Sequence, residues 1–336
     1  MLVSLLIALK LGSCNTSIYK MGEGLVLCEP TMVANLEGVG ERTVVAVGKN
    51  AKRMQGRTED SVAVGSPIFS GRIKDRELAI TMLKSFISAV VPNSFIKPKI
   101  KAVVCLPMGM DLKERKEVEF VCNHAGIQDV VFVPSIMAGA VGYNLPVEDA
   151  VGSCVVNIGG GSTDIATISA GSIISGVNIG IGGNNMDESI ANAIEEEHGI
   201  RIGEGVATDV KEEIGSLYPN DISSAEVAGI DTETSDGKFV VVESKTVYEA
   251  IEPFYDKIAE AIKAVMLSSP ANIIEDIKNR GVFVMGGASL TTGLEQYLRK
   301  KLNIPVQILD QTTAVDVIGA GMMLQDAKLL KICSKL

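Results

Sequence analysis

The chain has 336 residues, of which 46% are hydrophobic, and a formal net charge of -10. This length is enough for a full core and for two domains. Such an acidic chain is a poor candidate for general nucleic-acid binding, which needs a cationic surface. The six cysteines are scattered with no Cys-x-x-Cys pair. This pattern indicates reduced core thiols in a cytosolic protein.

The chain begins with the apolar run "MLVSLLIALKLG". The run has no basic segment before it and no clear small-residue cleavage site after it, so it does not resemble a secretory signal. It is also too short to cross a bilayer, which takes about 20 apolar residues. We therefore expect a buried first strand here.

Apolar, β-rich runs then alternate with amphipathic helical segments, which is typical of an α/β protein. Residues 75–91 carry an apolar stripe at helical spacing, and Asp111 with Glu114 forms a capping box at the start of another helix. Thr246 and Glu249 form a similar box, which predicts that a third helix begins at Thr246.

A short internal repeat is the most informative feature of the sequence. Residues 5–19 and 151–166 each contain an apolar strand, one polar residue, an apolar residue, a glycine, a small-residue turn, a Thr and a second apolar strand. We expect a β-hairpin in each half of the chain. Two such hairpins facing each other would clamp phosphates with backbone N–H groups and hydroxyls. The alternative, two ordinary hairpins in one large sheet, stays open at this point.

A third glycine pair, Gly286-Gly287, follows a predicted strand and precedes a predicted helix. This geometry lets a flat ring or a phosphate approach the N-terminus of a helix. The signal is weak when it stands alone.

Several ordered segments resemble the MreB family of bacterial actins, within the actin–sugar kinase–chaperone ATPase superfamily, and the resemblance covers nearly the whole chain. The segments are "LGSCNTSIY", "EPTMVA", "AVGKNAKRMQGRT", "IGGGSTDIATIS", "GIRIGEGVATDVKEEIGSLYP" and "VFVMGGASLTTGLEQYL". The resemblance implies an actin-like α/β fold. Two RNase-H-like domains, IA and IIA, would carry inserted subdomains IB and IIB, with a nucleotide cleft between them.

The resemblance also implies boundaries and site residues. Domain I would comprise residues 1–149 and 310–336, with IB at about 32–66, and domain II would comprise residues 150–309, with IIB at about 182–245. ATP or ADP would meet three groups of residues: Gly12, Ser13, Cys14 and Asn15; Gly159, Gly160, Gly161 and Ser162; and, around the adenosine, Thr208, Asp209, Lys211, Gly286, Gly287, Ala288 and Ser289.

The sequence departs from the family at acidic positions. Lys10, Asn157 and Asn184 stand at positions where the family usually has acids. In the family, the acids at the positions of Lys10 and Asn157 help to hold Mg²⁺ through its water shell. Ser135 occupies the position of the family's catalytic Glu. Mg²⁺ prefers hard oxygen ligands, and a serine hydroxyl is a poor general base. We therefore expect weak or absent ATP hydrolysis, no metal site made of protein ligands alone, and an uncertain requirement for Mg²⁺.

Two charged residues near these positions have open roles. The ammonium of Lys10 could neutralise phosphate directly as a point charge. Asp164 is the one obvious acid left in the cleft. It is either a catalytic group or a structural hydrogen-bond acceptor.

An apolar pair, Phe95 and Ile96, lies between Lys97 and Lys99, and the corresponding loop of the family inserts into membranes. Apolar tips flanked by basic residues suit shallow insertion into an anionic surface. Packing of this pair onto its own domain is the alternative. Because two side chains bind weakly, membrane association would need many copies in a filament.

The resemblance implies a nucleotide-binding filament that acts in cell shape and wall synthesis at the inner face of the cell membrane. Its expected partners are further copies of itself, membrane lipid and cell-wall or other MreB-type proteins, but no nucleic acid. Three alternatives remain: an active ATPase with altered metal handling, a non-polymerising or pseudo-ATPase paralogue that regulates a true MreB, and a sugar or acetate kinase. The near full-length match disfavours the kinase.

Overall fold

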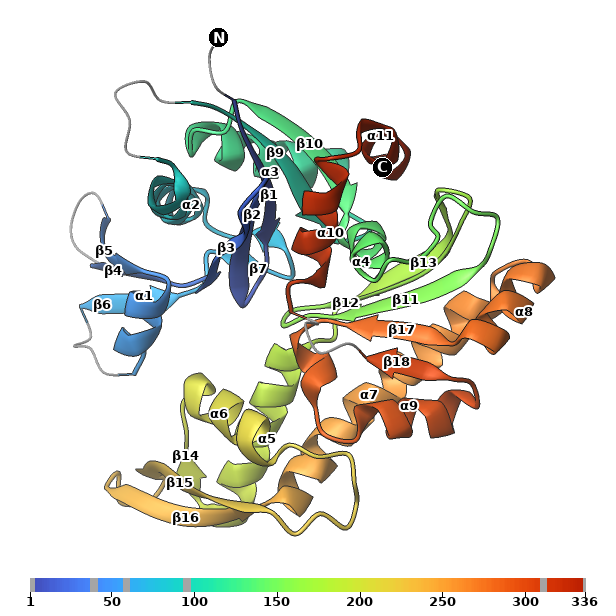
Figure 1. Cartoon of the computed structure of the whole chain (residues 1–336). Helices are drawn as coiled ribbons and strands as arrows, with labels where there is room; N and C mark the ends of the chain where they lie inside the picture. The colour runs from blue at the N-terminus through green and yellow to red at the C-terminus, as the bar shows by residue number, and fades with distance from the viewer. Residues whose placement is uncertain (1–3, 37–41, 57–60, 93–97, 309–312, 335–336) are drawn as a thin grey trace.

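The structure is a computed structural model that describes residues 4–36, 42–56, 61–92, 98–308 and 313–334. Two five-stranded sheets dominate this part of the chain (Figure 1). The first has the order β3-β2-β1-β9-β10, with bounds β1 Ser4–Leu11, β2 Asn15–Lys20, β3 Gly24–Pro30, β9 Lys99–Leu106 and β10 Asp129–Pro134. The second has the order β13-β12-β11-β17-β18, with bounds β11 Ser153–Ile158, β12 Thr163–Ser169, β13 Ser172–Ile179, β17 Val282–Met285 and β18 Val306–Ile308.

The two sheets have the same connectivity. In the first sheet, β1 pairs antiparallel with β2, β2 pairs antiparallel with β3, and β1, β9 and β10 run parallel. In the second, β11, β12 and β13 repeat the antiparallel part, and β11, β17 and β18 repeat the parallel part. The repeat predicted from the sequence is therefore the centre of two matching halves.

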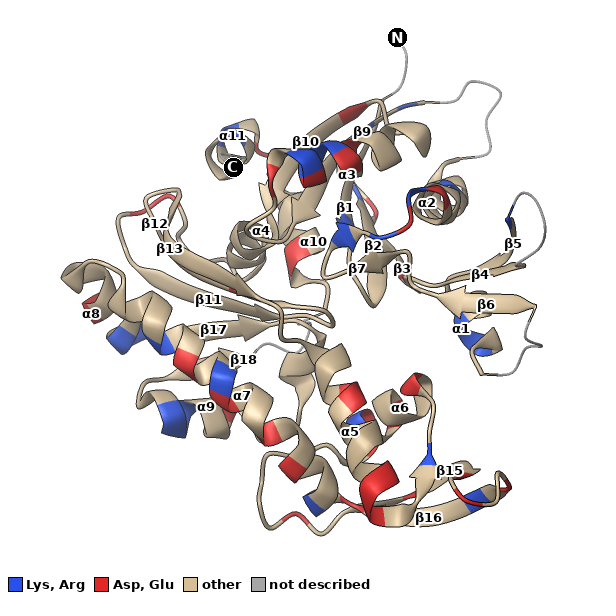
Figure 2. Cartoon of the chain, turned by 180° about the vertical axis from the view of Figure 1, so that it is seen from behind, with Lys and Arg blue, Asp and Glu red and all other residues tan. Residues whose placement is uncertain are grey.

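Helices cover the outer faces of both sheets. Helices α2 (Arg76–Val90) and α3 (Leu112–His124) share an apolar core with the first sheet. The second sheet shares its core with α5 (Gly183–His198), α7 (Ser244–Leu267), α8 (Ala271–Arg280) and α9 (Leu294–Leu302). Basic and acidic residues are interspersed over α7, α8 and α9 (Figure 2). None of the helices in the described ranges is long and apolar enough to cross a membrane.

Two glycine-rich helices lie between the sheets. Helix α4 (Ser135–Gly142) crosses α10 (Val315–Met323), and together they form a third core cluster with residues of both sheets. A Cβ atom on Gly319 would lie 1.9 Å from the carbonyl oxygen of Ala138, and one on Gly142 would lie 2.2 Å from that of Val315. The halves therefore approach so closely because these helix positions carry no side chain. Helix α11 (Ala327–Cys333) follows α10.

Each half also carries a smaller sheet. In the first half, β4 (Val33–Leu36), β5 (Thr43–Val47) and β6 (Val62–Gly65) lie beside α1 (Lys49–Met54), and a two-stranded hairpin follows, β7 (Ile68–Phe69) and β8 (Arg72–Ile73). In the second half, β14 (Ile200–Arg201), β15 (Ser224–Asp231) and β16 (Gly237–Glu243) lie beside α6 (Glu204–Ile214).

The helix starts follow the sequence in two cases and depart from it in one. Asp75 caps α2, and Asp111 forms the predicted capping box with Glu114 at the start of α3. The predicted start at Thr246 is wrong, because α7 begins at Ser244. The hydroxyl of Thr246 instead donates a 2.6 Å hydrogen bond to Glu197 on α5. Because this hydroxyl is bonded to a residue distant in sequence, the Thr246–Glu249 pattern did not mark the start of the helix.

Candidate functional site

The two repeated hairpins have equivalent turns. In the first turn (residues 12–15), the backbone N–H of Gly12 donates to the carbonyl of Asn15 over 3.1 Å; in the second turn (residues 159–162), Gly159 donates to Ser162 over 2.9 Å. The strand residues flanking the turns also correspond, with Leu11 opposite Thr16 and Ile158 opposite Thr163. The two hairpin turns predicted from the sequence repeat are confirmed, and the structure adds that their strands share the same register.

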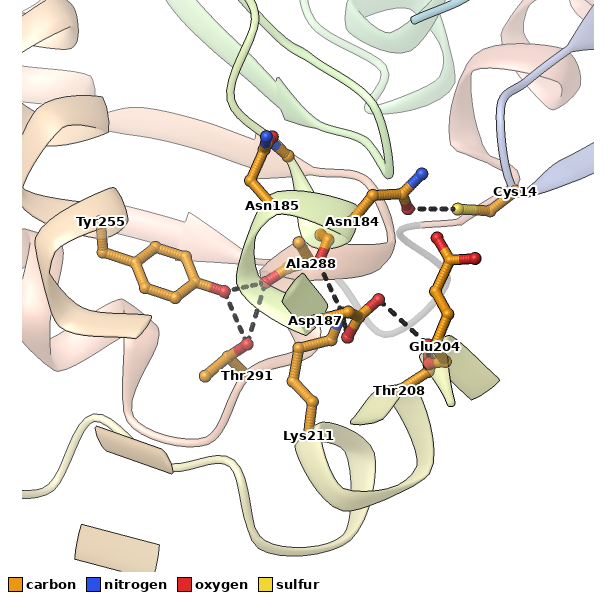
Figure 3. Close-up of polar contacts among 12 residues, drawn as sticks. Cys14, Asn184, Asn185, Asp187, Glu204, Thr208, Lys211, Tyr255, Ala288 and Thr291 are labelled. Carbon is orange, nitrogen blue, oxygen red and sulfur yellow. Dashed lines mark hydrogen bonds and ion pairs between the residues drawn. The ribbon is translucent and has the colours of Figure 1, made fainter. Parts of the chain in front are cut away.

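These two turns face each other and touch. A Cβ atom on Gly160 would lie 2.1 Å from Sγ of Cys14, and one on Gly161 would lie 2.8 Å from Oγ of Ser13. The thiol of Cys14 also donates to Oδ1 of Asn184, at 3.2 Å (Figure 3). A side chain on Gly160 or Gly161 would therefore displace the Cys14 thiol or the Ser13 hydroxyl of the first turn, and one on Gly161 would also lie 2.8 Å from the backbone N of Ser70. Two hairpins in one continuous sheet, the alternative left open above, are excluded because the hairpins belong to separate sheets.

A third element meets both turns, and the sequence analysis missed it. The tip of the β7–β8 hairpin is Ser70-Gly71, and the hydroxyl of Ser70 donates a 2.7 Å hydrogen bond to the carbonyl of Gly161. The backbone N–H of Gly71 donates to Oγ of Ser13 at 3.2 Å. Both tip residues have positive φ, 49° for Ser70 and 71° for Gly71. The available signal was the Ser-Gly dipeptide between Ile68-Phe69 and Arg72-Ile73, which marks a turn.

The N-terminus of α5 lies against the second turn. Gly183 and Asn184 donate their backbone N–H groups to the carbonyls of Gly159 and Gly160, at 2.9 and 2.8 Å. A Cβ atom on Gly182 would lie 2.4 Å from the carbonyl oxygen of Gly160. The helix start therefore holds the second turn in place through two backbone hydrogen bonds.

Two residues predicted to flank an adenosine converge on a buried carboxylate (Figure 3). Lys211 on α6 forms an ion pair with Oδ1 of Asp187 on α5 at 2.6 Å, and Thr208 donates to its Oδ2 at 3.0 Å. Lys211 also donates to the carbonyl of Gly183 at 3.0 Å. Asp209, predicted beside them, is exposed. Sequence reasoning missed Asp187, because a single acid in an amphipathic helix gives no distinctive signal.

The glycine turn after β17 is the last element of the candidate site. Gly286 has a φ of 97°, and a 3-10 turn (Gly287–Leu290) comes before α9, where the sequence predicted a helix directly. Its Ser289 hydroxyl donates back to the carbonyl of Gly286 at 2.7 Å. The Tyr255 hydroxyl donates to the carbonyl of Ala288 at 2.7 Å. A Cβ atom on Gly286 would lie 2.7 Å from Oδ1 of Asn157, so this turn sits beside the second hairpin.

Lys10 has a partner that the sequence did not reveal. Its Nζ lies 2.6 Å from Oδ2 of Asp316 at the start of α10. Burial opposes the charge of the ammonium, but the charge and hydrogen bond of Asp316 outweigh it and raise the pKa of Lys10. The sequence left open whether the Lys10 ammonium neutralises phosphate directly; the structure adds that an internal carboxylate engages it.

The sequence suggested that Asp164 was the one obvious acid left in the cleft. The structure shows two further carboxylates at this site, those of Asp187 and Asp316. Oδ1 of Asp164 accepts the backbone N–H of Met108 at 3.0 Å and the side-chain amide of Asn178 at 2.7 Å. Burial raises its pKa to about 6, against the effect of these hydrogen bonds. Asp164 therefore acts as a structural acceptor that joins the second sheet to the loop after β9.

Ser135 is buried and begins α4, directly after β10. Phe95 and Ile96, the predicted membrane tip, lie outside the described residues. Within the described ranges, no group of three or more His, Cys, Asp or Glu side chains is arranged to hold a metal ion.

Comparison with known proteins places the chain in a family. A family model described as MreB/Mbl protein matches residues 4–332. The cell shape-determining protein MreB of Escherichia coli (strain K12) is 35% identical over 322 residues, which cover 95% of this chain and 93% of the relative.

Solved structures agree. MreB5 of Spiroplasma citri bound to AMPPNP has a TM-score of 0.91 to this chain at 27% identity and covers 97% of both chains. Its ADP-bound structure has a TM-score of 0.89 at 27% identity and covers 98% of both. The MamK double helical filament has a TM-score of 0.82 at 20% identity and covers 96% of this chain and 99% of MamK, which shows a shared fold. The chain therefore belongs to the MreB/Mbl family and has the actin-like fold.

Proposed function

We propose that the chain is a cytoskeletal filament subunit that binds ATP or ADP between its two hairpin turns and acts in cell shape. The observation that carries the proposal is the facing pair of turns, where the absence of side chains on Gly160 and Gly161 lets the second turn approach Cys14 and Ser13 of the first. Backbone N–H groups gathered in such turns form a site for anions.

The adenosine would lie on the side of Thr208, Lys211 and the turn that contains Ala288. These residues come from α6 and from the loop after β17, and both adjoin the N-terminus of α5. The binding of AMPPNP and ADP by the related MreB5 supports the nucleotide assignment. We propose the domain division given above, with the nucleotide between domains I and II.

ATP hydrolysis by this chain is weak in our proposal, because Ser135 stands in place of the catalytic Glu and Asp164 is engaged by Met108 and Asn178. A positioned general base contributes about 10²–10⁴-fold to a rate. Single-turnover phosphate release should therefore be slow, and Ser135→Glu should accelerate it by at least about tenfold. Ser135→Ala is the matched control and should leave the rate unchanged. Rapid release by the unaltered chain would contradict this part of the proposal.

Filament formation is tested by ultracentrifugal pelleting and electron microscopy with ATP, ADP and no nucleotide. Nucleotide-dependent filaments are the expected result. Nucleotide binding without filaments at any protein concentration would instead favour the alternative, a non-polymerising paralogue that regulates a true MreB.

The filament lies at the inner face of the membrane in this proposal, where it would meet lipid and cell-wall or other MreB-type proteins. Co-sedimentation with anionic vesicles should fall when Phe95 and Ile96 are both changed to Ser. Phe239→Ser with Ile230→Ser, exposed apolar residues on β16 and β15, is the matched control and should pellet like the unaltered chain. Equal pelleting of the double variant and the unaltered chain would remove the lipid partner from the proposal.

A further inference from the structure

The resemblance to the family implies Mg²⁺, so the residues of this cleft must be tested against that ion. Mg²⁺ is bound through oxygen ligands, usually one or two carboxylates together with phosphate oxygens and waters. The positions at which the family has acids carry Lys10, Asn157 and Asn184. Asn184 is already engaged by the thiol of Cys14. None of these three side chains supplies a carboxylate.

The nearby carboxylates are engaged by the protein itself. Oδ2 of Asp316 lies 2.6 Å from the Lys10 ammonium, and its Oδ1 accepts the backbone N–H of Val317 at 2.8 Å. Asp164 is only 3% exposed. An ammonium also repels a divalent cation placed near it. The donor set at this place therefore does not fit Mg²⁺.

The same residues suit an anion that arrives without a metal. The side chain of Lys10 is one-fifth exposed while that of Asp316 is 2% exposed, so Lys10 is the more accessible side chain of the pair. An ammonium has three N–H donors, and Asp316 accepts one of them. The charges of Lys10 and Asp316 compensate each other, so this pair adds no net negative charge facing a phosphate.

We propose that this cleft binds its nucleotide without a divalent cation, with the Lys10–Asp316 pair at the position where the family holds its metal-binding acid. This inference rests on the proposed nucleotide site. The phosphates are held by backbone N–H groups of the two turns, by the Ser13 hydroxyl of the first turn and by the remaining donors of Lys10. The ligand is thus the free nucleotide anion.

Equilibrium dialysis of ADP and of a non-hydrolysable ATP analogue, in EDTA and in excess Mg²⁺, tests this directly. The affinity in EDTA should equal or exceed that in Mg²⁺. Weakening by more than about tenfold in EDTA would overturn the inference and leave the nucleotide site standing. An absence of binding in both buffers would instead refute the proposed function and this inference with it.

A double variant, Lys10→Asp with Asp316→Asn, restores an acid at position 10 and removes the partner carboxylate. Its affinity should fall by about tenfold or more in EDTA and recover when Mg²⁺ is added. The matched control is Lys20→Asp with Glu23→Asn, the same charge change in another ion pair (2.7 Å) at the far end of β2. Its affinities should remain those of the unaltered chain.

A milder pair of substitutions guards against a folding defect. Lys10→Gln with Asp316→Asn keeps a hydrogen bond possible without charge. Circular dichroism checks that both double variants are folded. If both fold and both keep full affinity in EDTA, Lys10 does not contribute to binding and the inference is wrong.

Discussion

The hydroxyl of Ser70 donates a 2.7 Å hydrogen bond to the carbonyl oxygen of Gly161, which joins the β7–β8 tip of the first half to the second turn. Two further contacts run in the same direction, from Met108 to Asp164 and from Cys14 to Asn184. All three join segments packed on the first sheet to segments packed on the second. The two halves are therefore linked by direct polar contacts around the proposed phosphate site.

Removing the Ser70 hydroxyl should loosen the second turn. Ser70→Ala leaves the buried carbonyl of Gly161 without this donor, which costs about 1–3 kcal/mol. We expect a lower free energy of unfolding and faster amide hydrogen exchange in residues 159–163. Ser66→Ala is the control, because that hydroxyl donates to the carbonyls of Ser13 and Ile68 within the first half. Equal exchange in the two variants would show that the Ser70 bond does not hold the turn.

The crossing of α4 and α10 should not tolerate a methyl group. In Gly319→Ala the new Cβ would lie 1.9 Å from the carbonyl oxygen of Ala138, and such overpacking costs about 1–3 kcal/mol or more. Gly205→Ala on α6 is a helical control whose Cβ would meet only Gln55, at 3.6 Å, so it should be neutral or stabilising by up to about 1 kcal/mol. Thermal unfolding measures both, and similar effects of the two substitutions would contradict the close crossing.

Asp164 should make stability depend on pH. Its folded-state pKa of about 6 exceeds the unfolded value of 3.8, so the folded state binds the proton more tightly. Stability from this group is greatest below about pH 4 and falls by up to about 3 kcal/mol as pH rises through 6. Asp164→Asn, which is neutral throughout, should lose this fall, so its stability relative to the unaltered chain should increase between pH 4 and 6. Urea unfolding across this range is the measurement.

Asp231→Asn provides a control of opposite sign. Hydrogen bonds from the backbone N–H groups of Thr234 and Glu233, with one from Lys238, lower the pKa of Asp231 to about 2. Its contribution is present above pH 4 and is lost as pH falls toward 2. A flat difference between pH 4 and 6 for Asp164→Asn would mean that this carboxyl is not buried as described.

The pairing of Lys10 with Asp316 should appear as a large coupling energy. Asp316→Asn leaves a mostly buried ammonium without its counter-ion, and breaking such a pair costs about 3 kcal/mol. The double variant Lys10→Met with Asp316→Asn should recover much of this loss. The exposed pair Lys245–Glu249, at 3.8 Å, should couple by less than about 0.5 kcal/mol. Additive losses at Lys10 and Asp316 would argue against their contact.

The sequence predicted what local pattern and repetition encode. The equivalent turns at Gly12 and Gly159, and the capping box of Asp111 with Glu114, depend on residues a few positions apart, so composition and spacing were sufficient. The contacts of Ser70, Asp187 and Asp316 depend on how separate elements pack, and no local pattern marks them. The partner of Lys10 could not be predicted for the same reason, since it lies on α10.

Equilibrium dialysis with labelled ADP tests the central claim most directly. The account predicts saturable binding of one nucleotide per chain, lost in Gly160→Ala, whose Cβ would lie 2.1 Å from Sγ of Cys14, and kept in Gly180→Ala, whose Cβ would meet nothing within 4 Å. Absence of ADP and ATP binding by the folded, unaltered chain, or unchanged binding by a folded Gly160→Ala, would contradict a nucleotide site between the two turns.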